Sequence, residues 1–254
     1  MLIDSHRLTA LDRETWDRQE GLDIIHAVTP GFSRKIDRAH AAIHAFFQED
    51  PSGYCGVSWG KDSVVVAGML QEVRPQTPLV WSRVRPIENP DCIAVRDAFL
   101  RKYPHAPYEE IDVWCRHDHA GWHATGTLEK GLNIAIEKYG DRHVSGVRGD
   151  ESATRNLRMA RHGENSARTS APIGRWTGDD VFAYLWVKEL PVHPAYAMSH
   201  GGLQDRARIR VASLGGKRGT GWGRTEWETT YYQSEMLALE QGLIPDVWIA
   251  NDPV

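Results

Sequence analysis

One short segment combines a lysine, two hydroxyl side chains and a glycine turn: Ser58-Trp59-Gly60-Lys61-Asp62-Ser63. The apolar residues 54–57 before it are typical of a buried strand, and the apolar run 64–70 after it is typical of a helix packed on a sheet. A turn between a strand and a helix N-terminus presents backbone N–H groups at the positive end of the helix dipole, which favours anions. The segment therefore predicts a phosphate site.

This segment is not a Walker A loop. That motif has the form G-x-x-x-x-G-K-(S/T), but Cys55 stands where its first glycine is required and Asp62 stands where it needs Ser or Thr. An ordinary glycine turn, with Asp62 as a helix cap, is the alternative to a phosphate site of another kind.

Three blocks in a fixed order resemble a known family. Residues 58–63 resemble the pyrophosphate loop S-G-G-K-D-S of the N-type ATP pyrophosphatases and their sulfonucleotide-handling relatives. Residues 144–155 resemble the pattern G-(L/V)-R-x-(D/E)-E-S-x-x-R, and residues 172–185 resemble P-(I/L)-x-x-W-t-x-x-D-V-w-x-Y-(I/L), followed by L-P-V-H-P-A-Y at 190–196. Together they are similar to the phosphoadenosine phosphosulfate (PAPS) reductase and ATP sulfurylase small-subunit family, in the adenine nucleotide α-hydrolase-like superfamily.

The resemblance implies a nucleotide site at the first block. ATP with Mg²⁺, or an adenylylated sulfate, is expected to bind at Ser58, Trp59, Gly60, Lys61, Asp62 and Ser63. Asp62 is the expected Mg²⁺ contact, directly or through water. Trp59 replaces the middle glycine of the family loop, and we expect its bulk to alter the entrance beside the phosphates.

The expected catalytic residues come from both the first and the second block. They are Lys61, Asp62, Arg148, Glu151 and Arg155. By resemblance, Arg148 approaches the phosphate or acidic group of the substrate, while Glu151 and Arg155 organise the site. A plain surface ion pair four residues apart on a helix is the alternative for Glu151 and Arg155.

Strand and helix patterns alternate from about residue 53, which predicts an α/β fold with a Rossmann-like, three-layer parallel sheet. Strands are expected at 54–57, 78–82, 108–113 and 143–147, and helices at 10–27, 32–49, 64–70, 93–103, 128–139 and 226–241. Ligands of such sheets bind at the carboxyl ends of the strands. Because Ser58, Ser82 and Arg148 all fall at expected strand ends, we place Ser82 in the same crevice.

The chain is expected to form one α/β domain with terminal additions. Residues 1–50 form a helical extension, residues 51–200 form the pyrophosphate-loop domain, and residues 201–254 form a Gly/Arg-rich segment and a helix packed on it. The run 215–224 is either an anion clamp or a surface loop.

Composition favours a globular cytoplasmic protein. Of 254 residues, 41% are hydrophobic and 25% are charged, and neither a membrane span nor a signal peptide is evident. The net charge of −4 argues against general duplex binding but allows a local basic strip.

The three cysteines show no C-x-x-C spacing, so neither a disulfide framework nor an iron–sulfur cluster is expected. The cluster Cys115, His117, His119 and His123 is either a metal site or a polar loop over the crevice. No cysteine follows Cys115, so the C-terminal E-C-G-x-H-type nucleophile of a PAPS reductase is missing.

The leading interpretation is therefore cleavage of ATP·Mg²⁺ between its α and β phosphates, which adenylates an unknown acceptor or feeds a sulfur-transfer step. One alternative is a PAPS or APS reductase, or an ATP sulfurylase-like activity. Another is a non-catalytic nucleotide-binding module that acts with partners in nucleic-acid modification. A homo-oligomer or a partner subunit is left open.

Overall fold

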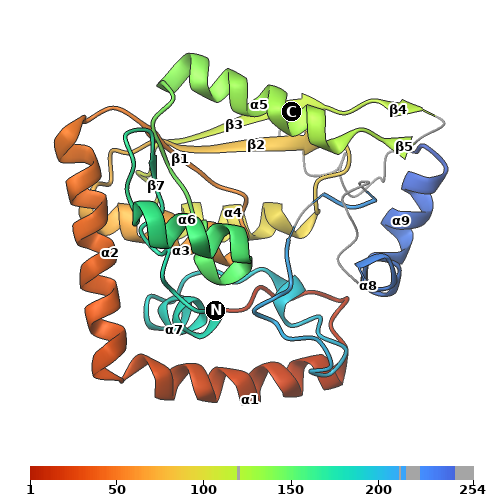
Figure 1. Cartoon of the computed structure of the whole chain (residues 1–254). Helices are drawn as coiled ribbons and strands as arrows, with labels where there is room; N and C mark the ends of the chain where they lie inside the picture. Colours follow the sequence, from red (N-terminus) through yellow and green to blue (C-terminus); the bar gives the residue numbers. More distant parts are fainter. Residues whose placement is uncertain (119–120, 212, 216–223, 244–254) are drawn as a thin grey trace.

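The computed structural model describes residues 1–118, 121–211, 213–215 and 224–243. Its centre is a parallel sheet of five strands in the order β3-β2-β1-β6-β7 (Figure 1). The strands are β1 (Tyr54–Gly56), β2 (Leu79–Arg85), β3 (Tyr108–Trp114), β6 (His143–Val144) and β7 (Thr169–Ser170). The predicted α/β fold with a parallel sheet is confirmed.

Helices cover both faces of this sheet. Helix α5 (Ala124–Tyr139) packs on β2 and β3 from one face, and helices α3 (Lys61–Val73) and α4 (Asp91–Lys102) lie on the other (Figure 1). The run from Val64 to Leu70 is wholly buried because α3 is enclosed by the sheet and by α7 (Gly178–Val187). Helices α1 (Ala10–Ala27) and α2 (Pro30–Glu49) form an outer layer, with α1 against α7.

The strand order reverses beside β1. After β1 the chain moves through β2 to β3, and after β3 it returns to place β6 on the other side of β1. The loop after β1 and the turn after β6 meet at the carboxyl ends of these two strands, where Arg148 pairs with Asp62 at 2.7 Å, and ligands of such sheets bind at this switch point. The predicted phosphate loop follows β1, and Arg148 follows β6.

Several element boundaries differ from expectation. Strand β6 ends at Val144 rather than at 147, α3 spans Lys61–Val73 rather than 64–70, and α5 begins at Ala124 rather than at 128. Strand β2 continues to Arg85 rather than ending at Ser82, because Arg83 and Arg85 pair across to Glu110 and Asp112 of β3, both at 2.8 Å. The predicted helix 226–241 is two helices, α8 (Arg224–Tyr231) and α9 (Gln233–Glu240), since Tyr232 leaves helical geometry with φ −124° and ψ 39°.

A small antiparallel hairpin precedes α5. Its strands are β4 (His117–Asp118) and β5 (Gly121–Trp122), and the Trp122 indole N–H donates to the carbonyl of Leu239 on α9 at 3.1 Å. His119 lies outside the described residues. Within the ranges the structure covers, no three His, Cys, Asp or Glu side chains are grouped so that they could hold a metal ion.

The remaining connections are a 3₁₀ turn η1 (Gly149–Glu151), helix α6 (Ala153–His162) and a second 3₁₀ turn η2 (Pro194–Tyr196). The predicted Gly/Arg-rich clamp at 215–224 falls almost entirely outside the described residues. No described helix is both long enough and apolar enough to cross a bilayer.

Candidate functional site

The loop after β1 is shaped by the core beneath it. Trp59 has a positive φ of 57° and a side chain with 0% exposure, packed against the rings of Trp81, Phe99 and Tyr108. A positive φ favours glycine, which gives a physical reason for the glycine of the resembling loop. The expectation that the bulk of Trp59 alters the entrance beside the phosphates is wrong, because its side chain points into the core.

Tyr196 fixes the start of helix α3 from the other side. Its hydroxyl accepts a hydrogen bond from the backbone N–H of Lys61 at 2.9 Å, and its ring centroid lies 4.9 Å from the Lys61 ammonium nitrogen. A side chain at Gly60 would bring its Cβ within 2.9 Å of this hydroxyl, so Gly60 permits the contact. Below them, the Ser58 N–H donates to the Ser63 hydroxyl at 3.2 Å, which closes the loop.

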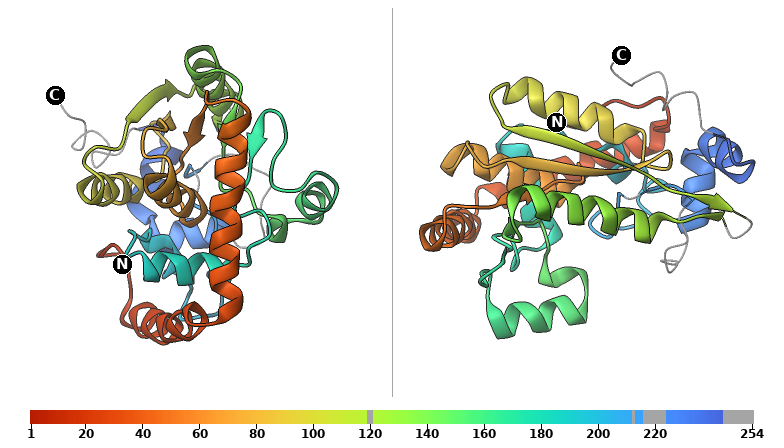
Figure 2. Two further views of the ribbon diagram at one scale, coloured as in Figure 1. Left: turned by 90° about the vertical axis from the view of Figure 1, so that its left-hand side faces the viewer. Right: turned by 90° about the horizontal axis from the view of Figure 1, so that it is seen from above.

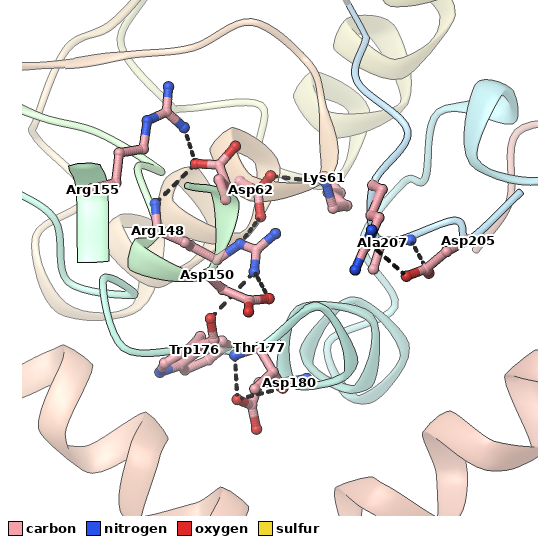
Figure 3. A network of polar contacts seen from close by, with 12 residues as sticks. Lys61, Asp62, Arg148, Asp150, Arg155, Trp176, Thr177, Asp180, Asp205 and Ala207 are labelled. Carbon is pink, nitrogen blue, oxygen red and sulfur yellow. Dashed lines mark hydrogen bonds and ion pairs between the residues drawn. The ribbon is translucent and has the colours of Figure 1, made fainter. Parts of the chain in front are cut away.

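Asp62 joins two buried cations. Its carboxylate lies 3.0 Å from the Lys61 ammonium through Oδ2 and 2.7 Å from Nε of Arg148 through Oδ1 (Figure 3). Burial lowers the pKa of Lys61, and the Asp62 carboxylate opposes that effect. Burial acts on the pKa of Arg148 in the same direction, but the carboxylates of Asp62, Glu151 and Asp150 together outweigh it, so this pKa is raised.

Arg148 reaches Asp62 because β6 and the N-terminus of α3 approach closely. A Cβ atom at Gly146 would lie 2.6 Å from the Asp62 carbonyl carbon, so only glycine fits there. The guanidinium also donates to Asp150 and to the carbonyl of Trp176, each at 3.2 Å. With a side chain only 2% exposed, Arg148 is held by α3, by η1 and by the loop before α7.

Glu151 and Arg155 form an ion pair, and the same carboxylate accepts from the Arg148 backbone N–H at 3.1 Å. The pair is therefore joined to the Arg148 cluster rather than isolated on the surface. Figure 3 shows Arg155 beside Arg148. Across from it, the Arg210 guanidinium donates to the Glu151 carbonyl at 3.2 Å.

These groups border a cleft of about 620 Å³. Its lining comes from the loop after β1, the turn after β6, the start of α7 and the segment 205–210. The charged lining residues are Lys61, Arg148, Arg208, Arg210, Asp150, Glu151, Asp179 and Asp205. Cations and carboxylates are equally represented, so the cleft is strongly polar.

The structure brings five of the predicted site residues into one network: Lys61, Asp62, Arg148, Glu151 and Arg155. Ser82 is placed differently, in the middle of β2. Its side chain faces Gly131 of α5, where an added Cβ would come within 2.8 Å. The strand runs on past it, so the premise that Ser82 ends a strand is wrong.

Sequence reasoning missed Tyr196, Asp150 and the segment with Arg208 and Arg210. Tyr196 stands in the block 190–196, whose likeness to the family was the available signal. The spacing of Arg208 and Arg210 carries no such signal. These residues lie far from β1 in the sequence, and only the tertiary fold brings them to the cleft. His193 is buried and packed, with Nδ1 accepting the Ala195 N–H at 3.1 Å, as a loop histidine would be.

The comparison with protein families agrees with this arrangement. The model of the phosphoadenosine phosphosulfate reductase domain matches residues 54–220. This chain belongs to the PAPS reductase domain family. The matched range holds the loop after β1, the turn after β6 and the lining segment around Arg208.

Among solved structures, the chain resembles a PAPS reductase from Candida auris in its phosphate complex, with a TM-score of 0.51 and 12% identity, over 70% of this chain and 89% of that one. A U34-tRNA thiolase from Methanococcus maripaludis with its 4Fe-4S cluster gives a TM-score of 0.45 at 17% identity, over 82% of this chain and 80% of that one. At such identities the first likeness concerns the fold alone. The search of curated proteins gives no match.

Proposed function

We propose that this PAPS reductase domain protein binds ATP at residues 58–63 and cleaves it between the α and β phosphates, transferring adenylate to an acceptor. One observation carries the proposal. At the sheet's switch point, a helix N-terminus and two buried cations, Lys61 and Arg148, converge on one polar cleft. Such a place offers a departing pyrophosphate both backbone donors and fixed positive charge.

Each group has a distinct part in the proposed reaction. The N–H groups of Asp62 and Ser63 belong to the first turn of α3 and are suited to the pyrophosphate oxygens, whereas that of Lys61 is already bonded to Tyr196. The Lys61 ammonium stabilises the charge that grows on the leaving group. Arg148 is suited to the α-phosphate side, since Asp62 holds it beside the loop. The protein mostly positions and neutralises, as phosphoryl-type transfers require.

The residues present do not form a dedicated Mg²⁺ site. Both oxygens of Asp62, the predicted ligand, are ion-paired to Lys61 and Arg148. Asp62 is better suited to positioning these two cations. Mg²⁺ that accompanies nucleotides takes many of its ligands from phosphates and water, so in this proposal it arrives with ATP, and no step depends on a protein-held metal.

The cysteines disfavour the thiol-dependent reductase alternative. Burial raises the pKa of Cys55 to about 12 and that of Cys115 to about 11, and it also raises the pKa of Cys92. All three are buried thiols rather than the exposed thiolates that act as nucleophiles. Adenylate transfer needs no thiolate, and this difference favours it.

The test is to compare Lys61→Ala with Lys130→Ala, which removes an exposed lysine of α5. Lys61→Ala should lower ATP affinity or turnover at least about tenfold, equivalent to about 1.4 kcal/mol, while Lys130→Ala should behave as the parent protein. Calorimetry measures ATP binding, and an enzyme-coupled assay measures pyrophosphate release with candidate acceptors. Equal ATP affinity and rate in the two variants would refute the loop assignment. Binding of ATP without pyrophosphate from any acceptor would favour a non-catalytic module.

A further inference from the structure

Helix α6 and the residues after it carry a concentration of arginine that the proposed nucleotide site leaves mostly unused. Residues 152–175 contain five arginines and a single carboxylate, Glu164, in a chain with a formal net charge of −4. The arginines are Arg155, Arg158, Arg161, Arg168 and Arg175. A locally positive surface, called the α6 surface below, therefore stands on an acidic protein.

The α6 surface projects away from the body of the molecule, as both views in Figure 2 show. Of the ten residues of α6, only Met159 is buried. Positions 155, 158 and 162 share one side of the helix, with 161 next to them. From position 155 to position 162 this basic side extends about 10 Å, which is longer than one phosphate group. Its shape suits an extended polyanion.

Three of these five arginines are ion-paired: Arg155 with Glu151, Arg168 with Asp141 and Arg175 with Glu164. The other two are available to a ligand. In the part of the chain that is described, neither Arg158 nor Arg161 is ion-paired, and Arg158 donates only to the Thr169 hydroxyl at 2.6 Å. Arg168 pairs with Asp141 at 3.0 Å, but its side chain is 75% exposed. Exposed pairs of this kind contribute little stability, so phosphate can replace the carboxylate at small cost.

The α6 surface is continuous with the cleft. Arg155, at the start of the helix, is ion-paired to Glu151, which lines the cleft. On the opposite wall, Arg210 donates to the Glu151 carbonyl. Arg208 lies 3.6 Å from the Asp205 carboxylate, in a pair where both side chains are exposed, 89% for Arg208. A basic track thus begins at the cleft with Arg208 and Arg210 and continues outward along α6.

We propose that the α6 surface binds the phosphodiester backbone of a nucleic-acid strand and presents one of its nucleotides to the cleft. Arginine forms paired hydrogen bonds with phosphate, and a series of such contacts positions a strand without reading its sequence. The proposal names the acceptor class of the adenylate transfer and rests on that function for its chemical purpose. Binding of the strand itself does not depend on ATP.

The experiment measures binding of fluorescent single-stranded RNA and DNA of one sequence by anisotropy, at several salt concentrations. The charge reversal R158E/R161E should weaken binding at least about tenfold and flatten the salt dependence by about 0.7 per lost phosphate contact. The matched control, R101E/K102E, reverses two exposed charges at the end of α4 and should bind as the parent protein does. ATP affinity should be the same in all three proteins.

The RNA and DNA arms show which sugar the strand carries. Absence of binding to both oligonucleotides, or equal losses in the two variants, would overturn the inference while leaving the ATP proposal intact. Preference for polyglutamate over both oligonucleotides would also overturn it and indicate an acidic protein partner. Conversely, if the Lys61→Ala variant retains ATP binding, the nucleotide site is refuted, while the inference about strand binding stands.

Discussion

Two of the walls of the cleft are built in opposite ways. The loop after β1 is buried from below by the aromatic cluster around Trp59 and fixed from the side by Tyr196. The segment after β6 leads into α6, where Met159 is the one buried residue of the described helix. Buried, closely packed segments open rarely, and segments with few buried contacts open readily. The first wall is therefore suited to holding phosphate in a fixed geometry, and the second to accommodating a larger partner.

The test with the largest expected effect truncates one apolar side chain to alanine in each of these two walls. Trp59→Ala removes a fully buried ring and should lower the free energy of unfolding by about 3–5 kcal/mol. Leu157→Ala removes a side chain of α6 that is 64% exposed, and should change it by less than about 0.5 kcal/mol. Urea titration measures both. Similar losses in the two variants would mean that the walls do not differ.

A fall in pH should lower the free energy of unfolding because His193 is buried on the packed side of the cleft. Burial lowers the pKa of His193 to about 3 from its ordinary 6.5. Below pH 6.5 the unfolded chain binds a proton there and the folded protein does not, so stability is lost as the pH falls from 6.5 toward 3, by up to about 1.4 kcal/mol per pH unit from this group. His193→Asn should show a shallower decline over that window in urea titrations at several pH values. An unchanged decline would show that His193 is not responsible.

A smaller effect is expected from loss of the hydrogen bond between the Lys61 N–H and the Tyr196 hydroxyl. Tyr196→Phe leaves the ring beside the Lys61 ammonium but removes the acceptor of the Lys61 N–H. An unsatisfied buried donor costs about 1–3 kcal/mol. Tyr139→Phe, which loses a hydroxyl bonded to Glu109 nearer the surface, is the matched control. If the two variants unfold at the same urea concentration, Tyr196 does not hold the loop.

The smallest effect should come from the other wall. Arg155→Gln removes the ion pair with Glu151, and because Arg155 is 37% exposed the change in unfolding free energy should stay below about 1 kcal/mol. Activity should fall more than stability does, since Glu151 also bonds the Arg148 backbone. An assay of pyrophosphate release measures the activity, and urea titration measures the stability. A large loss of stability would show that this wall is as firmly built as the first.

The sequence predicted well where local pattern and packing agree. The apolar runs at 54–57 and 64–70 indicated a strand and a helix, and the three blocks indicated the family that the comparison confirms. Prediction failed where distant residues change the meaning of a local pattern. Arg83 and Arg85 look like the polar end of a strand, yet carboxylates on β3 neutralise them inside the sheet.

The prediction for the Trp59 side chain failed for a related reason. Its place in the loop indicated a neighbour of phosphate, but three aromatic rings from β2, α4 and β3 form its surroundings. These partners are distant from Trp59 in the sequence, so the local pattern does not indicate them. Tyr196 was hidden in the same way, because its contact with Lys61 spans 135 residues of chain.

The backbone of Trp59 also has a consequence for temperature. A left-handed conformation costs a bulky residue about 1–2 kcal/mol, and in this protein the aromatic cluster stabilises it. The loop after β1 therefore keeps its shape only while the interior around Trp81 and Phe99 is intact. Heating should loosen this loop only together with its aromatic surroundings, so the proposed nucleotide binding should disappear in the same narrow interval in which the whole domain melts.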